Sequence, residues 1–246
     1  MAKKRAQKDD GIAKAAKALR RRPLARLTFR WALRIMLGSA ALVFVALIFY
    51  TIFNPPTTFY MAQEKRRLGG ISQTWTDADD IAPVMLRSVV AAEDANFCLH
   101  AGFDMAAIRT AIREGGNRGA STLSQQVVKN VFLWQGRNFL RKALEAMITP
   151  AAELIWSKRR ILELYLNVAE FGEGVFGIHA AAQKSFGTTP AKLTAQQAAL
   201  LAAVLPNPKE RSAAKPTRFL NRRAAAIRDG AATIKADGRA ACFEGG

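Results

Sequence analysis

The sequence is poor in the residues that build metal sites and disulfide scaffolds. Its 246 residues include two cysteines and two histidines. Neither His100 nor His179 stands at a metal-ligand spacing from a cysteine or from the other histidine, so neither indicates a zinc site. Cys98 and Cys242 could pair in an oxidising compartment, but two cysteines do not make a disulfide framework, and we do not predict a bridge.

Acidic residues are also scarce, and a strand pattern is missing. The chain has 19 Asp and Glu against 37 Lys and Arg, which gives a formal net charge of +18. No segment alternates clearly between apolar and polar residues, and no internal repeat is visible. Half of the residues are apolar, enough for a core. We therefore predict a mainly α-helical chain with one catalytic domain and accessory segments.

Charge is absent from one long segment, residues 35–63. Its first part is nearly all apolar, and roughly 20 such residues cross a bilayer core. Twelve Lys or Arg precede it within residues 1–34, so the N-terminus should stay cytoplasmic. The basic and apolar regions are both too long for a signal peptide, while a buried core helix is the alternative. We predict a basic cytoplasmic tail (1–34), a transmembrane helix (35–53), a connector (54–80) and a catalytic domain outside the cytoplasm (81–246).

The basic tail could in principle bind nucleic acid or anionic lipid. Because it adjoins the predicted membrane span, anionic lipid is the nearer partner, and we predict no nucleic-acid partner.

Glu93 stands at the end of an apolar helical pattern. Asp79 and Asp80, followed by Pro83, predict the start of this helix with an N-cap and a proline in the first turn. A carboxylate at the end of an apolar helix can have a pKa raised by burial, which suits a general acid or base. The alternative is a helix-end carboxylate held in a salt bridge.

A second polar group follows near residue 120. Thr122 and Gln125 fit a capping box, so a helix should begin there, with Ser121 beside its free N–H groups, which favour anions. Polar side chains then recur on one side of the helix. They are Gln125, Gln126, Lys129 and Asn130. This stripe is either a set of donors for a ligand or a solvated helix face.

A third group lies between residues 137 and 145. Arg141 and Glu145 are four residues apart and could simply pair on a helix surface. Alternatively, Lys129, Arg137 and Arg141 clamp a pyrophosphate, while Glu145 holds a divalent metal or orients the cations. We expect Pro150 to kink or break the helix that carries this group.

Two familiar motifs are expected to be coincidental. Residues 172–177 fit G-x-G-x-x-G, but the run before them, 161–167, is helical, and no acidic residue follows about 20 positions on. Residues 212–215 fit S-x-x-K, but neither S-D-N nor K-T-G follows. We therefore predict neither a dinucleotide site nor a penicillin-binding site.

Five segments, in chain order, resemble the motifs of the peptidoglycan glycosyltransferases, glycosyltransferase family 51, in their monofunctional biosynthetic form. The segments are Glu93-Asp94-x-x-Phe97-x-x-His100-x-Gly102, Gly119-Ala120-Ser121-Thr122-Leu123-Ser124-Gln125-Gln126, Arg141-Lys142-x-x-Glu145, Ile161-Leu162-Glu163-x-Tyr165-Leu166-Asn167 and Phe171-Gly172-x-Gly174-x-x-Gly177-Ile178. The match runs from about residue 81 to residue 208. Ser124 stands where Thr is usual, and the loop between the second and third motifs is short.

This resemblance implies a lysozyme-like domain of two lobes that polymerises lipid II into β-1,4-linked glycan by inverting transfer. Undecaprenyl diphosphate would leave, and no transpeptidase activity is expected. The implied catalytic residues are Glu93, as base on the acceptor 4-hydroxyl, and Glu145, as support for the diphosphate through Mg²⁺ or another divalent cation. The implied substrate-binding residues are Asp94, Phe97, His100, Ser121, Thr122, Gln125, Gln126, Lys129, Asn130, Arg137 and Arg141.

The implied partners are lipid II, the growing glycan strand, the bilayer of the bacterial inner membrane, and cell-division or elongation proteins. The catalytic domain would lie in the periplasm. Two other functions remain open. A membrane-anchored lytic enzyme of lysozyme-like fold would also use one catalytic Glu, but would not need cations gathered on a phosphate. A non-catalytic scaffold that binds lipid II or division proteins would leave Glu93 dispensable.

Overall fold

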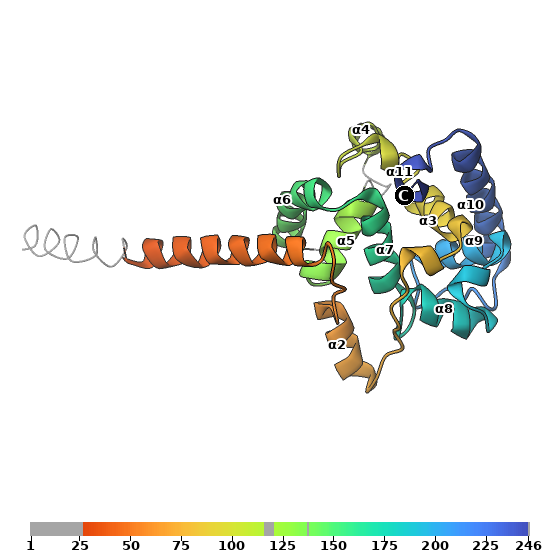
Figure 1. Cartoon of the computed structure of the whole chain (residues 1–246), viewed down its shortest axis with the longest axis horizontal. Coiled ribbons are helices and arrows are strands. Elements are labelled where there is room, and N and C mark those ends of the chain that lie inside the picture. Colours follow the sequence, from red (N-terminus) through yellow and green to blue (C-terminus); the bar gives the residue numbers. More distant parts are fainter. Residues whose placement is uncertain (1–26, 116–120, 137, 246) are drawn as a thin grey trace, which may run out of the picture. The chain divides into compact units, whose positions relative to one another are not determined.

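A computed structural model describes residues 27–115, 121–136 and 138–245 (Figure 1). The prediction of a mainly α-helical chain is confirmed. The helices after the N-terminal one are α2 (Phe59–Leu68), α3 (Pro83–Glu93), α4 (Met105–Arg113), α5 (Leu123–Phe132), α6 (Phe139–Ile155), α7 (Lys158–Val168), α8 (Gly177–Phe186), α9 (Ala195–Val204), α10 (Arg218–Ala236) and α11 (Ala241–Glu244). Short 3₁₀ turns η1 (Ala78–Asp80), η2 (Phe97–Leu99) and η3 (Pro190–Lys192) and strands β1 (Glu170–Gly172) and β2 (Val175–Phe176) complete the fold.

The N-terminal helix, Leu27–Phe49, is the one helix of the described residues that is long and apolar enough to cross a membrane, with a mean hydropathy of 2.3. Among the described residues this helix covers 27–49, so it includes residues before the predicted span, 35–53, and ends four residues before that span does. The chain divides into two compact units, Met1–Ala46 and Leu47–Gly246. Most of the predicted basic tail lies outside the described residues.

The core of the second unit is built from two groups of helices. In the first, α9 and α10 pack against α3, and in the second, α5 packs against α6 and α7. The packing is close where Gly230 of α10 meets α3, because a Cβ on Gly230 would lie 3.3 Å from the Cβ of Ala91. Helix α3 buries Met85 and Val89 completely and ends at Glu93. This packing holds the end of α3 in a defined place.

The only sheet of the described residues is a two-stranded antiparallel hairpin, β1 and β2, which the sequence pattern did not predict. Strands of three and two residues are too short for alternation to be visible. The hairpin also explains the glycines of the G-x-G-x-x-G run. Gly174 and Gly177 have φ of 68° and 80°, conformations that other residues rarely adopt. The run therefore forms the turn of this hairpin and the start of α8; that it binds no dinucleotide stays a prediction.

Gly177→Ala should destabilise the domain by about 2 kcal/mol. An added Cβ would lie 3.0 Å from the backbone oxygen of Asn167, in a backbone conformation that alanine already disfavours. Gly187→Ala is the matched control, because its φ is 62° but its Cβ would meet nothing within 4 Å. We expect about 1 kcal/mol for the control. Urea unfolding of both variants measures the difference, and equal losses would contradict the predicted clash.

The segment predicted as a connector, 54–80, is part of the folded unit. Thr58 caps α2 by accepting a hydrogen bond from the backbone N–H of Met61, and Met61 is buried. Further along, the backbone N–H of Thr76 donates to Asn167 Oδ1 at 2.8 Å, and Asn167 Nδ2 donates back to the Thr76 carbonyl. Pro55 and Pro56, before α2, and Gly69 and Gly70, after it, are residues typical of linkers, but here they flank the two ends of a packed helix.

Two local expectations differ from the structure. The N-cap of α3 is Ala82, without a side-chain bond, while Asp79 pairs with Arg159 instead. Pro83 does occupy the first helical turn, as predicted. The other difference is at Pro150, where α6 continues without the break that was one of the two expected outcomes; the kink stays a prediction. The buried face of α6 packs on both sides of the proline, which outweighs the loss of one helical hydrogen bond.

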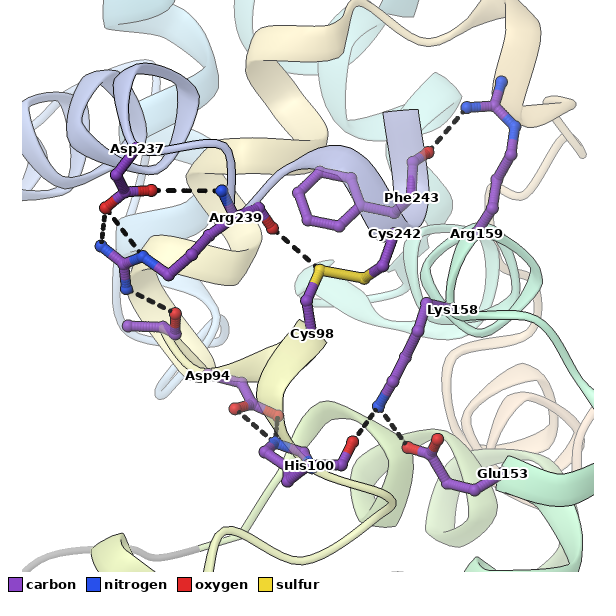
Figure 2. Close-up of a disulfide and its surroundings, with 11 residues drawn as sticks. Asp94, Cys98, His100, Glu153, Lys158, Arg159, Asp237, Arg239, Cys242 and Phe243 are labelled. Carbon is purple, nitrogen blue, oxygen red and sulfur yellow. Dashed lines mark hydrogen bonds and ion pairs between the residues drawn. A yellow bond between two sulfur atoms is a disulfide. The ribbon is translucent and has the colours of Figure 1, made fainter. Parts of the chain in front are cut away.

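Cys98 and Cys242 form a disulfide, with Cα atoms 5.8 Å apart (Figure 2). The sequence left open whether they pair, and the structure shows that they do. The two cysteines are separated by 144 residues, and only the fold brings η2 and α11 together.

Candidate active site

The carboxylate of Glu93 is buried at the end of α3 and is only half satisfied. Its Oε2 accepts a hydrogen bond from Gln126 Nε2 at 2.9 Å. Its Oε1 is buried and has no hydrogen-bond partner in the described part of the chain. Burial raises the pKa of Glu93, while the Gln126 bond and the charges of Arg223 and Lys129 oppose that rise. The site thus holds a carboxylate of raised pKa with one oxygen ready to accept a proton.

Asp94 connects the end of α3 to the start of α5. Its carboxylate lies 2.9 Å from His100 Nε2 and accepts a hydrogen bond from the backbone N–H of Leu123 at 3.0 Å. Phe97 is 0% exposed and packs beneath this connection. The three motif residues predicted to touch substrate, Asp94, Phe97 and His100, are thus engaged in the framework around Glu93.

The predicted capping box is present at the start of α5. Thr122 accepts a hydrogen bond from the backbone N–H of Gln125, and the Gln125 side chain accepts from the backbone N–H of Thr122. Both side chains are buried, and the Thr122 hydroxyl donates to the Gly102 carbonyl at 2.7 Å. The predicted stripe is therefore divided, because Gln125 serves the cap while the side chains further along α5 face a cavity.

Two cavities are lined by the two partners of the Gln126–Glu93 hydrogen bond, one by each residue. The larger, about 400 Å³, is lined by Gln126, Lys129 and Asn130 of α5 and by Tyr165 of α7. The smaller, about 220 Å³, is lined by Glu93 together with Ser121, Thr122 and Asp104 among others. Gln126 faces the larger cavity while it binds the carboxylate that lines the smaller one. A substrate group bound on either side of Gln126 would therefore lie near Glu93.

Cationic side chains from α5 and α6 gather around one buried glutamate. Glu145 is 2% exposed, and its carboxylate is bound by Arg141 Nη1 at 2.6 Å and by Lys142 Nζ. Lys142 Nζ also donates to Ser121 Oγ at 3.0 Å. Burial lowers the pKa of Lys129, and the charge of Glu145 opposes that shift. The Arg141–Glu145 pair is thus buried rather than on the surface. Arg137 lies outside the described residues.

Glu145 is the residue predicted to hold a divalent metal ion. Both oxygens of Glu145 are already taken by cations. Within the described ranges, no group of three or more His, Cys, Asp or Glu side chains could hold a metal ion. These residues therefore do not fit a magnesium ion held by protein ligands alone, and the magnesium requirement stays a prediction.

The sequence did not reveal several other residues that line the larger cavity, among them Tyr60, Glu170 and Lys209. Tyr60 of α2 donates its hydroxyl hydrogen to Glu170 Oε2, and burial raises the pKa of Glu170. Lys209, which also lines the cavity, lies 3.0 Å from Glu64 Oε2. Tyr60 stands in the presumed connector, so only the contact of α2 with the domain reveals it. Arg223 of α10, whose charge reaches Glu93, carried no sequence signal either.

Comparisons with known proteins cover most of the chain. A family model described as Transglycosylase matches residues 62–231. A protein of Jannaschia sp. (strain CCS1) named "Biosynthetic peptidoglycan transglycosylase" is 62% identical over 224 residues, which are 91% of this chain and 94% of that protein. Proteins of the same name from Rhizobium meliloti (strain 1021) and Stutzerimonas stutzeri (strain A1501) are 50% and 48% identical, over 71% and 79% of this chain and 76% and 85% of their own lengths.

Proposed function

Because the chain belongs to the transglycosylase family, we propose that it polymerises lipid II into β-1,4-linked glycan strands of peptidoglycan and releases undecaprenyl diphosphate. The resemblance to the peptidoglycan glycosyltransferases is confirmed by the family match and by the relatives, and the coarse activity, peptidoglycan transglycosylation, follows with it. The finer proposal rests on the geometry around Glu93.

The observation that carries it is the half-satisfied carboxylate of Glu93. The donor sugar of lipid II is α-linked to diphosphate and the product linkage is β, so a single inversion suffices and one base is needed. In this proposal Glu93 Oε1 accepts the proton of the acceptor 4-hydroxyl as that oxygen attacks the donor anomeric carbon. The bond from that carbon to the diphosphate oxygen breaks in the same step. Gln126 holds the other carboxylate oxygen and keeps Oε1 in place.

The other carboxylates beside Glu93 already have partners. Asp94 is bound by His100 and by the N–H of Leu123, and Asp104 accepts from Asn96 Nδ2 at 2.8 Å and from two backbone N–H groups. A glycan hydrolase of the inverting kind would need a second carboxyl group as acid or base. This site offers cations instead, which suit a diphosphate leaving group, because that group needs its charge neutralised more than it needs a proton.

In this proposal, the donor lipid II binds so that Lys129 of α5 faces its diphosphate. Arg141 and Lys142 are held on α6 by Glu145, so this glutamate acts by orienting cations. Asn130 and Tyr165 line the same cavity and would contact donor sugars. No step is assigned to a metal ion.

Incubation of the full-length protein in detergent with labelled lipid II tests the proposal. We expect glycan polymer, resolved by size, together with free undecaprenyl diphosphate. Cleavage of preformed glycan without polymer would instead favour the lytic enzyme. Binding of lipid II without either product would favour the scaffold.

Gln126→Leu should move the acid limb of the rate–pH profile to higher pH. Glu93 must be unprotonated to accept a proton, so the rate rises with pH through its pKa. Loss of the Gln126 N–H removes a bond that lowers this pKa, so more alkaline conditions are needed for the same fraction of base. Tyr165→Phe is the control, since it removes the hydroxyl that donates to Gln126 Oε1 but leaves the Glu93 bond. A larger shift in the control would contradict the assignment.

We also propose that the N-terminal helix anchors the enzyme in the inner membrane with its catalytic domain in the periplasm. The basic residues before the apolar run favour a cytoplasmic N-terminus, and a disulfide in the domain is typical of an oxidising compartment. Exposed apolar side chains on α6 add a surface that could contact lipid. The most exposed are Phe139 (91%), Leu154 (87%) and Met147 (74%). Cell-division or elongation proteins remain predicted partners.

A further inference from the structure

The C-terminal segment, residues 232–245, lies beyond the part of the chain that the family model matches, 62–231. It comprises the last turn of α10, a turn and the short helix α11. The disulfide joins this segment to Cys98, five residues after Glu93 (Figure 2). A segment outside the family match is thus covalently fastened to the first motif of the family.

Further contacts join the C-terminal segment to residues 95–98. Arg239 Nη1 donates to the Ala95 carbonyl at 2.9 Å. The Arg239 carbonyl oxygen lies 2.8 Å from Cys98 Sγ (Figure 2). The rings of Phe97 and Phe243 are 6.5 Å apart between centroids, and both side chains are 0% exposed. Residues 95–98 therefore take much of their packing from the C-terminal segment.

The C-terminal segment is in turn anchored to the body of the domain. Glu244 Oε1 lies 2.6 Å from Arg87 Nη1 of α3, and Arg159 Nη1 of α7 donates to the Phe243 carbonyl at 2.9 Å. Helix α11 has only four residues, and such a short helix at a chain end is marginal unless something ties it down. The disulfide is the covalent tie.

A chain of contacts leads from this tie to the base. Asp94 and His100, at the two ends of the fastened segment, bind each other, and Lys158 Nζ holds the His100 carbonyl at 2.7 Å. Asp94 also accepts from the backbone N–H of Leu123, at the start of α5. The same helix carries Gln126, which binds Glu93 Oε2. A displacement of residues 94–100 would therefore change how Glu93 sits against Gln126.

We propose that the Cys98–Cys242 disulfide is a positioning element for catalysis: it braces residues 94–100 so that Glu93 is presented to the acceptor hydroxyl. This inference rests on the proposed function of Glu93 as the base. None of the described residues after 231 lines either cavity, so the C-terminal segment acts through residues 94–100 and not by direct contact with a bound substrate.

Reduction of the wild-type enzyme tests the brace. Both cysteines are half-buried, so a small phosphine can reach the bond. The full-length protein in detergent is assayed with lipid II when oxidised, after reduction with TCEP, and after reoxidation. We expect kcat to fall about tenfold on reduction, KM to change by less than roughly twofold, and reoxidation to restore the rate. Amide hydrogen exchange should quicken in residues 94–100 and 237–245, while the far-UV circular dichroism stays unchanged.

The control is the double variant Cys98→Ser/Cys242→Ser. It should have the low kcat of the reduced enzyme and should not respond to TCEP. A reduced wild type that polymerises at the oxidised rate overturns the proposal. So does a rate that falls only in parallel with the loss of helical signal, since that would be a purely structural role.

The two proposals fail in different ways. If the oxidised wild type makes no polymer, the proposed function is wrong. Amide hydrogen exchange still tests whether the disulfide holds residues 94–100 in place. Unchanged exchange in residues 94–100 after reduction would then overturn the brace, and faster exchange confined to the two segments would support it.

Discussion

Glu93→Gln should lower the rate of glycan polymerisation by about 10³-fold, the usual contribution of a general base. The amide is close to the carboxylate in size and keeps one oxygen for the Gln126 bond, so the fold should not suffer. It cannot accept the proton of the acceptor hydroxyl at neutral pH. Initial rates with labelled lipid II, at saturating substrate, measure the loss, and lipid II binding should be nearly unchanged.

Glu173→Gln is the matched control for this variant. Glu173 is exposed and pairs with Arg67 on the surface, so the same chemical change there should leave the rate within about twofold, as for most surface substitutions. Polymer formation at similar rates by Glu93→Gln and by the wild type would remove Glu93 from the role of base.

Lys129→Met should lower kcat by about 10²-fold to 10³-fold, a loss comparable to that of one preorganised donor for developing negative charge. Lys129 is largely buried on α5, and burial lowers its pKa, so its ammonium acts where water screens little. Methionine keeps most of the length and apolar character of the lysine stem, so the packing of α5 should survive. The rate of undecaprenyl diphosphate release measures the loss.

Lys142→Met is the comparison for Lys129→Met. The Lys142 side chain is 44% exposed and shares Glu145 with Arg141, which remains in the variant. We therefore expect a smaller loss, of about tenfold. If Lys142→Met lowered kcat as much as Lys129→Met does, the leaving diphosphate would have to be placed closer to α6 than we propose. No loss in either variant would contradict the proposal that these cations neutralise it.

The parts of the site that lie close together in the sequence could be predicted from it. The capping box of Thr122 and Gln125 is a local hydrogen-bond pattern, and it is present as expected. The apolar spacing before Glu93 predicted a helix that ends in this carboxylate, and α3 does end there, where burial raises the pKa of Glu93. Such patterns depend on residues within one or two helical turns, where backbone geometry fixes which side chains meet.

The features that the sequence did not reveal depend on contacts between segments far apart in the chain. Tyr60, taken as part of a connector, meets Glu170 because α2 folds back onto the domain. The disulfide between Cys98 and Cys242 was not expected because spacing alone cannot show which chain segments lie side by side. Asp94 was expected to orient the surroundings of Glu93 and to bind substrate; its carboxylate is bound by His100 and by the start of α5, and its contact with substrate stays a prediction.

By itself, the sequence determined the helical class, the apolar N-terminal helix, the family and the residue types of the site. These follow from the periodicity of apolar residues, the length of the apolar run and the order of the motifs, all of which can be read from the sequence. Only the tertiary structure decided that, among the described residues, Glu93 Oε1 has no hydrogen-bond partner while the carboxylates of Asp94 and Asp104 are bound. It also decided that a disulfide joins the end of the chain to the segment after Glu93. Both depend on where packing places groups far apart in the sequence, because a hydrogen bond or a disulfide forms only within a few ångströms.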